Sequence, residues 1–313
     1  MGHSLIYGVC PTLIGPRSAQ EPHCCGTLWR NYHDEEKVTH SHFFITFAAQ
    51  KKKVMKIREV IDALESFAPL PLQDDYDNSG LQVGTTETEV SGVLLCLDVT
   101  RQVVDEAINN GCNMIISHHP LLFRPLKRLT DDSIGSIVMS AVRVGITIYA
   151  SHTNLDNASK GVNMRIANVL GLTDVKPLDE QPDGNGAGII GRFPKSLTEQ
   201  QLLALVKEKF GVTCIRHNGE LGRPIKRMAV CGGSGAFLTD KAVEQGADAF
   251  MTGEIGYHRF FGYDGTIKLI EAGHFESEQF TVDLIADILK EAFPKLRVLK
   301  TSNKTNPINY YIG

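Results

Sequence analysis

The sequence lacks the features that define several large classes of protein. None of its apolar runs approaches the roughly 20 residues that a helix needs to cross a bilayer, so no membrane-spanning helix is expected. Its seven cysteines form no CxxC pair, which is typical of free thiols in a reducing, cytoplasmic compartment rather than of a disulfide framework. The formal net charge is -4, so a general attraction to nucleic acid or to acidic membranes is not indicated.

The N-terminal part of the chain differs from the rest. Residues 1–54 have no sustained helical or strand period, hold five of the eleven histidines, and contain the basic run Lys51–Lys53. We predict a poorly ordered N-terminal extension over 1–54 and a compact domain that begins at Met55.

From Met55 onward, apolar segments of strand length alternate with amphipathic helical segments. This alternation predicts an α/β fold with two related lobes, each built on a mostly parallel sheet flanked by helices. We interpret the Pro/Gly-rich passage Gln181–Gly191 as a hinge or loop between the lobes. The first lobe is then predicted to span 55–180 plus 272–313, and the second lobe 181–271.

Histidine and carboxylate side chains gather directly after predicted strands. Parallel strands deliver the residues at their carboxyl ends to one edge of a sheet, where open α/β proteins bind ligands. Six such residues follow three strands: His118 and His119 after 114–116, His152 and Asp156 after 146–149, and His274 and Glu278 after 268–271. Imidazole and carboxylate groups suit a divalent ion such as zinc, iron, manganese or nickel, so we predict a metal site in the cleft between the lobes.

The spacing within these segments bears on the number of ions. His152 and Asp156 are four residues apart, as are His274 and Glu278, so each pair shares one face if its segment is helical. The two adjacent histidines of the SHHP segment cannot easily face the same ion, which favours two ions over one. Spacing alone leaves the number of ions open.

Other strand ends supply further candidates. Asp98 either orients a ligand imidazole or belongs to the start of the next helix. Glu254 is a candidate general base or orienting group, and His258 is a candidate proton shuttle or substrate contact. The alternative for both is a solvated helix start.

A glycine-rich loop, CGGSG at 231–235, lies between a predicted strand and a helix. A loop of this kind can present backbone N–H groups to a phosphate. Gly232, Gly233 and Ser234 are therefore candidate substrate contacts, although the loop lacks the lysine and the spacing of a P-loop.

Six sequence blocks, taken in order, resemble one protein family. They are DNSGLQVG (77–84), SHHP (117–120), HTNLD (152–156), CGGSG (231–235), TGEIGYH (252–258) and GHFESE (273–278). Together they are similar to the NGG-one-interacting-factor-three-like family, whose members are also called GTP cyclohydrolase I type 2 homologues. The resemblance covers about residues 55–313.

The resemblance implies a two-lobed α/β fold, a ring-shaped homohexamer and a centre of two divalent metal ions per chain. It places His152 beside the metals. By motif, it assigns five metal ligands: His118, His119, Asp156, His274 and Glu278. It also implies a metal-dependent hydrolase that opens the imidazole ring of GTP or of a related small-molecule nucleotide.

Two other functions stay open on the sequence alone. A metal-dependent phosphoesterase or nucleotidase would use the CGGSG loop to hold a phosphate and would release free phosphate instead of formate. A non-catalytic regulatory or scaffold protein would bind metal without turning over any nucleotide.

Overall fold

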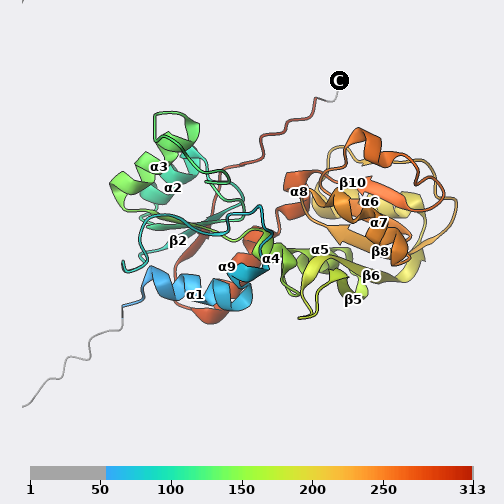
Figure 1. The fold of residues 1–313 in the computed structure, drawn as a ribbon, viewed down its shortest axis with the longest axis horizontal. Helices are drawn as coiled ribbons and strands as arrows, with labels where there is room; N and C mark the ends of the chain where they lie inside the picture. The colour runs from blue at the N-terminus through green and yellow to red at the C-terminus, as the bar shows by residue number, and fades with distance from the viewer. Residues whose placement is uncertain (1–53, 312–313) are drawn as a thin grey trace, which may run out of the picture. The chain divides into compact units, whose positions relative to one another are not determined.

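The computed structural model describes residues 54–311, so the predicted extension over 1–54 lies outside the described residues apart from Val54. The described chain forms two β-sheets with helices packed against them (Figure 1), which confirms the predicted α/β class with two sheets. Within this part of the chain, no helix is both long enough and apolar enough to span a membrane.

The first sheet has five strands and is mostly parallel, as predicted. Only its edge strand β1 is antiparallel, to β4, while the other pairings are parallel. Every residue of β2, β3 and β4 is buried, which explains their nearly continuous apolar sequences. In spatial order the strands are β1 (Gly80–Val83), β4 (Thr147–Ala150), β3 (Met114–Ser117), β2 (Val93–Cys96) and β11 (Val298–Lys300).

Helices cover both faces of this sheet (Figure 1). Because side chains alternate along a strand, Leu95 and Ile116 join one apolar cluster with α1 and α9, whereas Leu94 and Ile115 join a second cluster with α2 and α3. The helices are α1 (Ile57–Phe67), α2 (Arg101–Asn109), α3 (Ser133–Val144) and α9 (Thr281–Ala292), and a 3-10 turn, η1 (Leu70–Leu72), follows α1.

The second sheet is mixed rather than mostly parallel, so the prediction is wrong for this lobe. Its centre, β8–β9–β10, is parallel, but β5, β6 and β7 pair antiparallel to their neighbours. In spatial order the strands are β5 (Thr173–Glu180), β6 (Gly186–Leu197), β8 (Ile225–Cys231), β9 (Ala249–Thr252), β10 (Lys268–Glu271) and β7 (Arg216–His217).

The passage Gln181–Gly191 is not a hinge between the lobes. Its first residues form the turn of the β5–β6 hairpin, and the remainder is the beginning of β6. Gly184 and Gly186 adopt positive φ angles that favour glycine. The glycine-rich composition of this passage therefore reflects a tight turn and not a lobe boundary. The second sheet consequently begins at Thr173, whereas the sequence placed the boundary at residue 181.

Short helices begin where two strands end, and these helices position the site. α4 (Thr153–Asn157) follows β4, and α8 (His274–Glu278) follows β10. His274 and Glu278 therefore lie on one helix, as their four-residue spacing requires if they are to share a face. For the other pair, Asp156 lies in α4 and His152 is the N-cap residue just before it. The remaining helices of the described chain are α5 (Val162–Leu170), α6 (Glu199–Phe210) and α7 (Thr239–Glu244), with 3-10 turns η2 (Gly235–Leu238) and η3 (Tyr257–Phe260).

Candidate metal centre

The end of β3 places two adjacent imidazoles in different environments. His118 is fully buried, and its Nδ1 lies 2.8 Å from the carbonyl oxygen of Ser151. Nδ1 of His119 lies 2.7 Å from Oδ1 of Asp98. Because a carbonyl and a carboxylate only accept hydrogen bonds, each Nδ1 donates its proton and each Nε2 faces the other way.

Two further imidazoles from other segments are held in the same manner. Nδ1 of His274 donates to Glu254 over 2.8 Å, and Nδ1 of His152 donates to Asp77 over 2.7 Å. This arrangement leaves the Nε2 atoms of all four histidines available as ligands, which is the usual orientation of metal-binding imidazoles.

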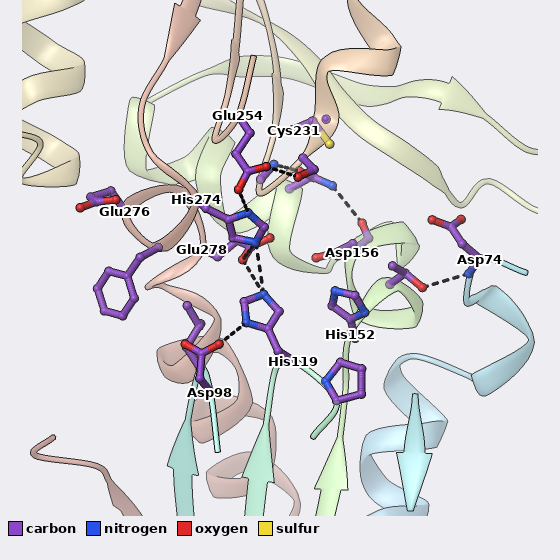
Figure 2. Close-up of a pocket in the computed structure, with 18 of the residues that line it drawn as sticks. Asp74, Asp98, His119, His152, Asp156, Cys231, Glu254, His274, Glu276 and Glu278 are labelled. Carbon is purple, nitrogen blue, oxygen red and sulfur yellow. Dashed lines mark hydrogen bonds and ion pairs between the residues drawn. The ribbon is translucent and has the colours of Figure 1, made fainter. Parts of the chain in front are cut away.

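The carboxylate of Glu278 lies among these nitrogen atoms (Figure 2). Its side chain is 4% exposed and comes from the last residue of α8. Oε2 lies 3.0 Å from Nε2 of His119 and 3.1 Å from Nε2 of His274, and Oε1 lies 3.7 Å from Nε2 of His118. One carboxylate thus faces two separate groups of nitrogen ligands.

A divalent cation fits the polar atoms that the protein itself leaves unpaired. Nε2 of His118 and Oδ1 of Asp156 are 3.7 Å apart, and neither buried atom has a hydrogen-bond partner among the described residues. Burial of such atoms is costly unless a cation or another partner satisfies them. Three groups of residues have potential ligand atoms within 4.8 Å of one another: His119, His274 and Glu278; His118, Asp156 and Glu278; and His118, His119 and His152.

The electrostatics of the site favour positive charge. Burial alone would lower the pKa values of His119 and His274, but hydrogen bonds to carboxylates outweigh it and raise them to about 10 and about 9. Burial likewise opposes ionisation of Glu278, yet the charge of His118 and hydrogen bonds from the histidines hold the pKa of Glu278 well below its usual value. The pKa of Asp156 is instead raised, by burial. Metal ions would replace the protons held here.

The structure places two predicted supporting residues against imidazoles of the candidate metal site. Asp98 accepts from His119, whereas Thr100 caps α2, so this geometry favours the orienting alternative for Asp98 over the helix-cap alternative. Glu254 accepts a hydrogen bond from His274 through Oε1 and from the Ser234 hydroxyl through Oε2, over 2.7 Å. Burial would raise the pKa of Glu254, but these hydrogen bonds outweigh it and lower the pKa. A lowered pKa suits an orienting group better than a general base.

His258 does not reach the site. It lies on η3, it is exposed, and its ring contacts those of Tyr257 and Phe261. It is not among the described residues that line the cavity over the histidine and carboxylate cluster. The predicted proton shuttle therefore has no geometric support, because η3 directs this side chain to a different surface.

The glycine N–H groups of the CGGSG loop are not available to a phosphate, contrary to the prediction. The N–H of Gly232 donates to Oδ1 of Asn163, and the N–H of Gly233 donates to the hydroxyl of Ser277. The glycines serve close packing instead, since a Cβ on Gly233 would lie 2.1 Å from Oε1 of Glu278. Gly232 and Ser234 line the cavity, but the glycines of the loop are explained by its close packing against Glu278.

A cavity of about 530 Å³ opens over the cluster. Its inner wall holds His119, His152, Asp156, His274 and Glu278 (Figure 2). Aromatic and apolar side chains that sequence reasoning did not single out form other parts of the lining: Tyr76, Phe123, Phe237, Phe275, Ile308 and Tyr310.

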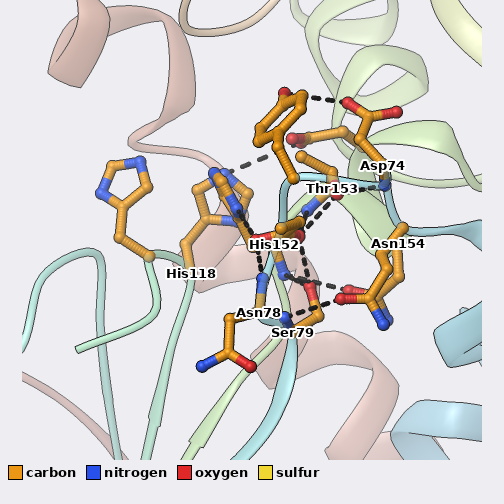
Figure 3. Close-up of polar contacts among 12 residues, drawn as sticks. Asp74, Asn78, Ser79, His118, His152, Thr153 and Asn154 are labelled. Carbon is orange, nitrogen blue, oxygen red and sulfur yellow. Dashed lines mark hydrogen bonds and ion pairs between the residues drawn. The ribbon is translucent and has the colours of Figure 1, made fainter. Parts of the chain in front are cut away.

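Asp77 is the main functional residue that sequence reasoning missed. Its side chain is fully buried, and it accepts hydrogen bonds from His152 and from the hydroxyl of Thr153. Figure 3 shows the polar contacts around His152, to which Ser79 also contributes. Burial would raise the pKa of Asp77, but hydrogen bonds from His152 and Thr153 outweigh it and hold the pKa well below its usual value. The only signal was the DNSGLQVG block, interpreted as turn geometry.

Comparison with known proteins finds relatives that match most of this chain. A GTP cyclohydrolase 1 type 2 homolog of Lactococcus lactis is 38% identical over 261 residues, covering 81% of this chain and 98% of the relative. One of Clostridium acetobutylicum is 33% identical over 265 residues, covering 82% and 99%.

Solved structures have the same fold. A hypothetical protein of Staphylococcus aureus aligns with a TM-score of 0.77 at 29% identity, over 82% of this chain and 100% of that one. A Bacillus cereus protein related to NIF3 aligns with a TM-score of 0.74 at 25% identity, over 83% and 100%. The model of the Duf34/NIF3 (NGG1p interacting factor 3) family matches residues 55–307, and the chain therefore belongs to this family, as the motif blocks predicted.

Proposed function

We propose that the protein is a hydrolase that uses two divalent metal ions to open the imidazole ring of a purine nucleotide or a related compound. One observation carries the proposal. The carboxylate of Glu278 faces two ligand groups, with His119 and His274 on one oxygen and His118 on the other. That arrangement supports two ions that share Glu278.

Each ion would be held by residues of this chain. Asp156 and His118 with Oε1 of Glu278 would hold the first, and His119 and His274 with Oε2 would hold the second. When bound, the ions would supply Lewis-acid polarisation of the substrate and a more acidic water molecule. The metal identity is proposed only as zinc, iron, manganese or nickel, because imidazole and carboxylate ligands suit all four.

His152 is the residue that we propose to move protons. Its Nδ1–H is directed to Asp77, and among the described residues its Nε2 has no hydrogen-bond partner while it lines the cavity. The neutral imidazole can therefore accept a proton at Nε2, with Asp77 stabilising the charged ring. Glu254 and Asp98 would instead keep His274 and His119 in position.

The reaction type follows from the name of the relatives, which are called GTP cyclohydrolase 1 type 2 homologs. In such a ring opening, one water cleaves the imidazole ring at C8 of the purine and a second water releases that carbon as formate. The phosphoesterase alternative loses its main support, because the N–H groups of Gly232 and Gly233 already donate within the protein.

The proposed assembly is a homohexamer, in keeping with the family resemblance. A surface cluster formed by Tyr257, His258 and Phe261 supports association of subunits, because contact between copies would remove exposed aromatic rings from water. Light scattering on the purified full chain tests this directly. A monomeric mass at micromolar concentration would refute the hexamer.

The function is tested with the full-length protein after metal loading. Wild type, His119→Ala and Glu291→Ala, an exposed residue of α9 outside the cavity, are incubated with purine compounds while formate and phosphate are both measured. Formate from wild type and Glu291→Ala, but not from His119→Ala, is expected. Phosphate alone would indicate a phosphoesterase, and neither product from a metal-filled protein would indicate a binding protein.

A further inference from the structure

Apart from the histidines, the charged side chains that line the cavity within the described residues are all carboxylates. Within residues 54–311 these carboxylates come from six residues: Asp74, Asp98, Asp156, Glu254, Glu276 and Glu278. Asp77, which does not line the cavity, adds a further carboxylate in contact with His152. Figure 2 shows Glu276 and Asp74 on the periphery of the cluster, away from the proposed metal ligands.

This charge exceeds what two divalent ions would neutralise. Four positive charges would face the carboxylates of six lining residues and of Asp77, so the metal-loaded cavity would keep a negative potential. A nucleoside triphosphate brings several more negative charges into a partly enclosed space, where Coulomb repulsion is stronger than in bulk water. The cavity therefore disfavours a polyphosphate.

The glycine N–H groups of the CGGSG loop do not offset this repulsion. Phosphates in proteins are usually bound by Arg or Lys side chains or by free backbone N–H groups at a loop. Here Gly232, Gly233 and Gly235 donate their N–H groups to Asn163, Ser277 and Thr252. Ser234 donates its hydroxyl to the carboxylate of Glu254.

The cavity lining also presents exposed aromatic surface. Tyr76 is 64% exposed and Phe123 is 44% exposed, although both are large and line the cavity. Their ring centroids lie 6.3 Å apart, and the ring of Phe123 meets that of His152 at 6.2 Å, edge to face. Exposed aromatic side chains that share a cavity mark a ligand site, and such rings pack well against planar groups.

The C-terminal segment adds another apolar part to the lining and is tied to the same carboxylates. The hydroxyl of Thr305 donates to Oδ2 of Asp98, and the amide of Asn306 donates to Oε1 of Glu276, both over 3.0 Å. Ile308 and Tyr310 follow and line the cavity. These bonds hold the segment against the site, so its side chains can contact a bound molecule.

We propose that this site takes a planar heterocycle without phosphate groups, such as a nucleobase or nucleoside, in preference to a nucleoside triphosphate. The inference rests on the proposed hydrolase function and narrows its substrate class. The ions held by the proposed metal ligands would polarise the reacting ring, and the aromatic side chains would pack face to face or edge to face against the planar group.

Binding can be measured without turnover. Titration calorimetry of the metal-loaded full chain with guanosine, GMP and GTP at low ionic strength should give affinities that fall in that order. We expect GTP to bind on the order of tenfold more weakly than guanosine, and added salt should narrow the gap because screening weakens the repulsion. Equal or tighter binding of GTP overturns the proposed substrate class, and so does failure of all three compounds to bind.

A charge-neutral variant tests the physical cause. Glu276→Gln should improve GTP binding relative to guanosine, whereas Glu291→Gln, which removes an exposed carboxylate outside the cavity, should leave the ratio unchanged. An unchanged ratio in Glu276→Gln would overturn the electrostatic argument. Failure of the hydrolase proposal would look different: nucleoside binds in the predicted order, but no formate appears.

Discussion

Oδ1 of Asp156 lies 3.7 Å from Nε2 of His118, and both atoms are buried without a hydrogen-bond partner among residues 54–311. By contrast, both ring nitrogens of His119 and Nδ1 of His274 lie within hydrogen-bond distance of carboxylate oxygens. A gap of this length between a buried nitrogen and a buried oxygen is too long for a hydrogen bond but has room for a cation that contacts both. The pair therefore identifies one of the two proposed metal positions.

Gly233 should be needed for metal binding because of the space it leaves. In Gly233→Ala the new Cβ would lie 2.1 Å from Oε1 of Glu278 and must displace that carboxylate. We expect the variant to lose most of its metal and to unfold more easily than wild type. Elemental analysis and denaturant unfolding measure the two effects.

Gly211→Ala is the matched control for Gly233→Ala. Gly211 ends α6 with φ 65, close to φ 59 of Gly233, but no atom lies within 4 Å of its Cβ position. Gly211→Ala should lose only about 1–2 kcal/mol of stability, the cost of placing alanine in a left-handed conformation, and it should keep its metal. If both variants keep their metal equally well, the packing of the loop against Glu278 has no role in binding.

Asp77 should affect turnover more than metal content. Asp77→Asn can no longer accept from His152 Nδ1 and Thr153 with full strength, so His152 loses its fixed orientation. We expect a large fall in kcat with metal content close to wild type, and a loss of stability of about 1–3 kcal/mol. Loss of metal in parallel with activity would make His152 a ligand rather than a proton acceptor.

Metal uptake should release protons and become tighter as pH rises. The pKa of His119 is raised to about 10 and that of His274 to about 9, so without metal both rings are protonated near neutral pH. A metal can bind only the neutral rings, and affinity should therefore increase between pH 6 and pH 9. Calorimetry in buffers of different ionisation enthalpy counts the protons; no release at pH 7.5 would contradict the assignment.

The stability of the metal-free protein should show the opposite trend. Both histidines have folded-state pKa values above the usual value of 6.5, so their contribution is fully present below that pH and is lost as pH rises through about 9 to 10. Thermal unfolding in chelator across this range measures it. Addition of metal should remove the decline.

Residues 1–53 should be dispensable for the site. The family match begins at residue 55, and every residue of the metal-binding cluster lies after it. A chain that starts at Val54 is expected to fold and to bind the same amount of metal as the full chain. Loss of either would show that the N-terminal segment takes part in the structure.

The first sheet and the histidines at its edge followed from local patterns. Continuous apolar runs such as Met114–Ile116 are characteristic of parallel strands buried on both faces, and the histidines after β3 and β4 accordingly meet at one edge of the first sheet. His274 and Glu278 follow β10 of the second sheet, so the expectation that all three strand ends share the edge of one sheet is wrong. The four-residue spacing of His274 and Glu278 also predicted that they share a helical face, as they do in α8.

Features that depend on long-range pairing could not be predicted in the same way. The β5–β6 hairpin resembles a flexible loop in sequence because its turn is rich in glycine, and only pairing with β8 reveals the mixed sheet. Asp77 lies 75 residues from His152 in sequence, so no spacing rule connects them. The C-terminal residues Thr305 and Asn306 reach the site only because β11 returns to the first sheet.

The number of metal ions per chain tests the central claim most directly. Elemental analysis should find about two transition-metal ions in wild type, about one in Asp156→Asn or His274→Ala, and almost none in Glu278→Gln, because Glu278 faces both groups of ligands. Glu291→Gln should match wild type. Two ions in Glu278→Gln, or none in wild type after metal loading, would contradict the account.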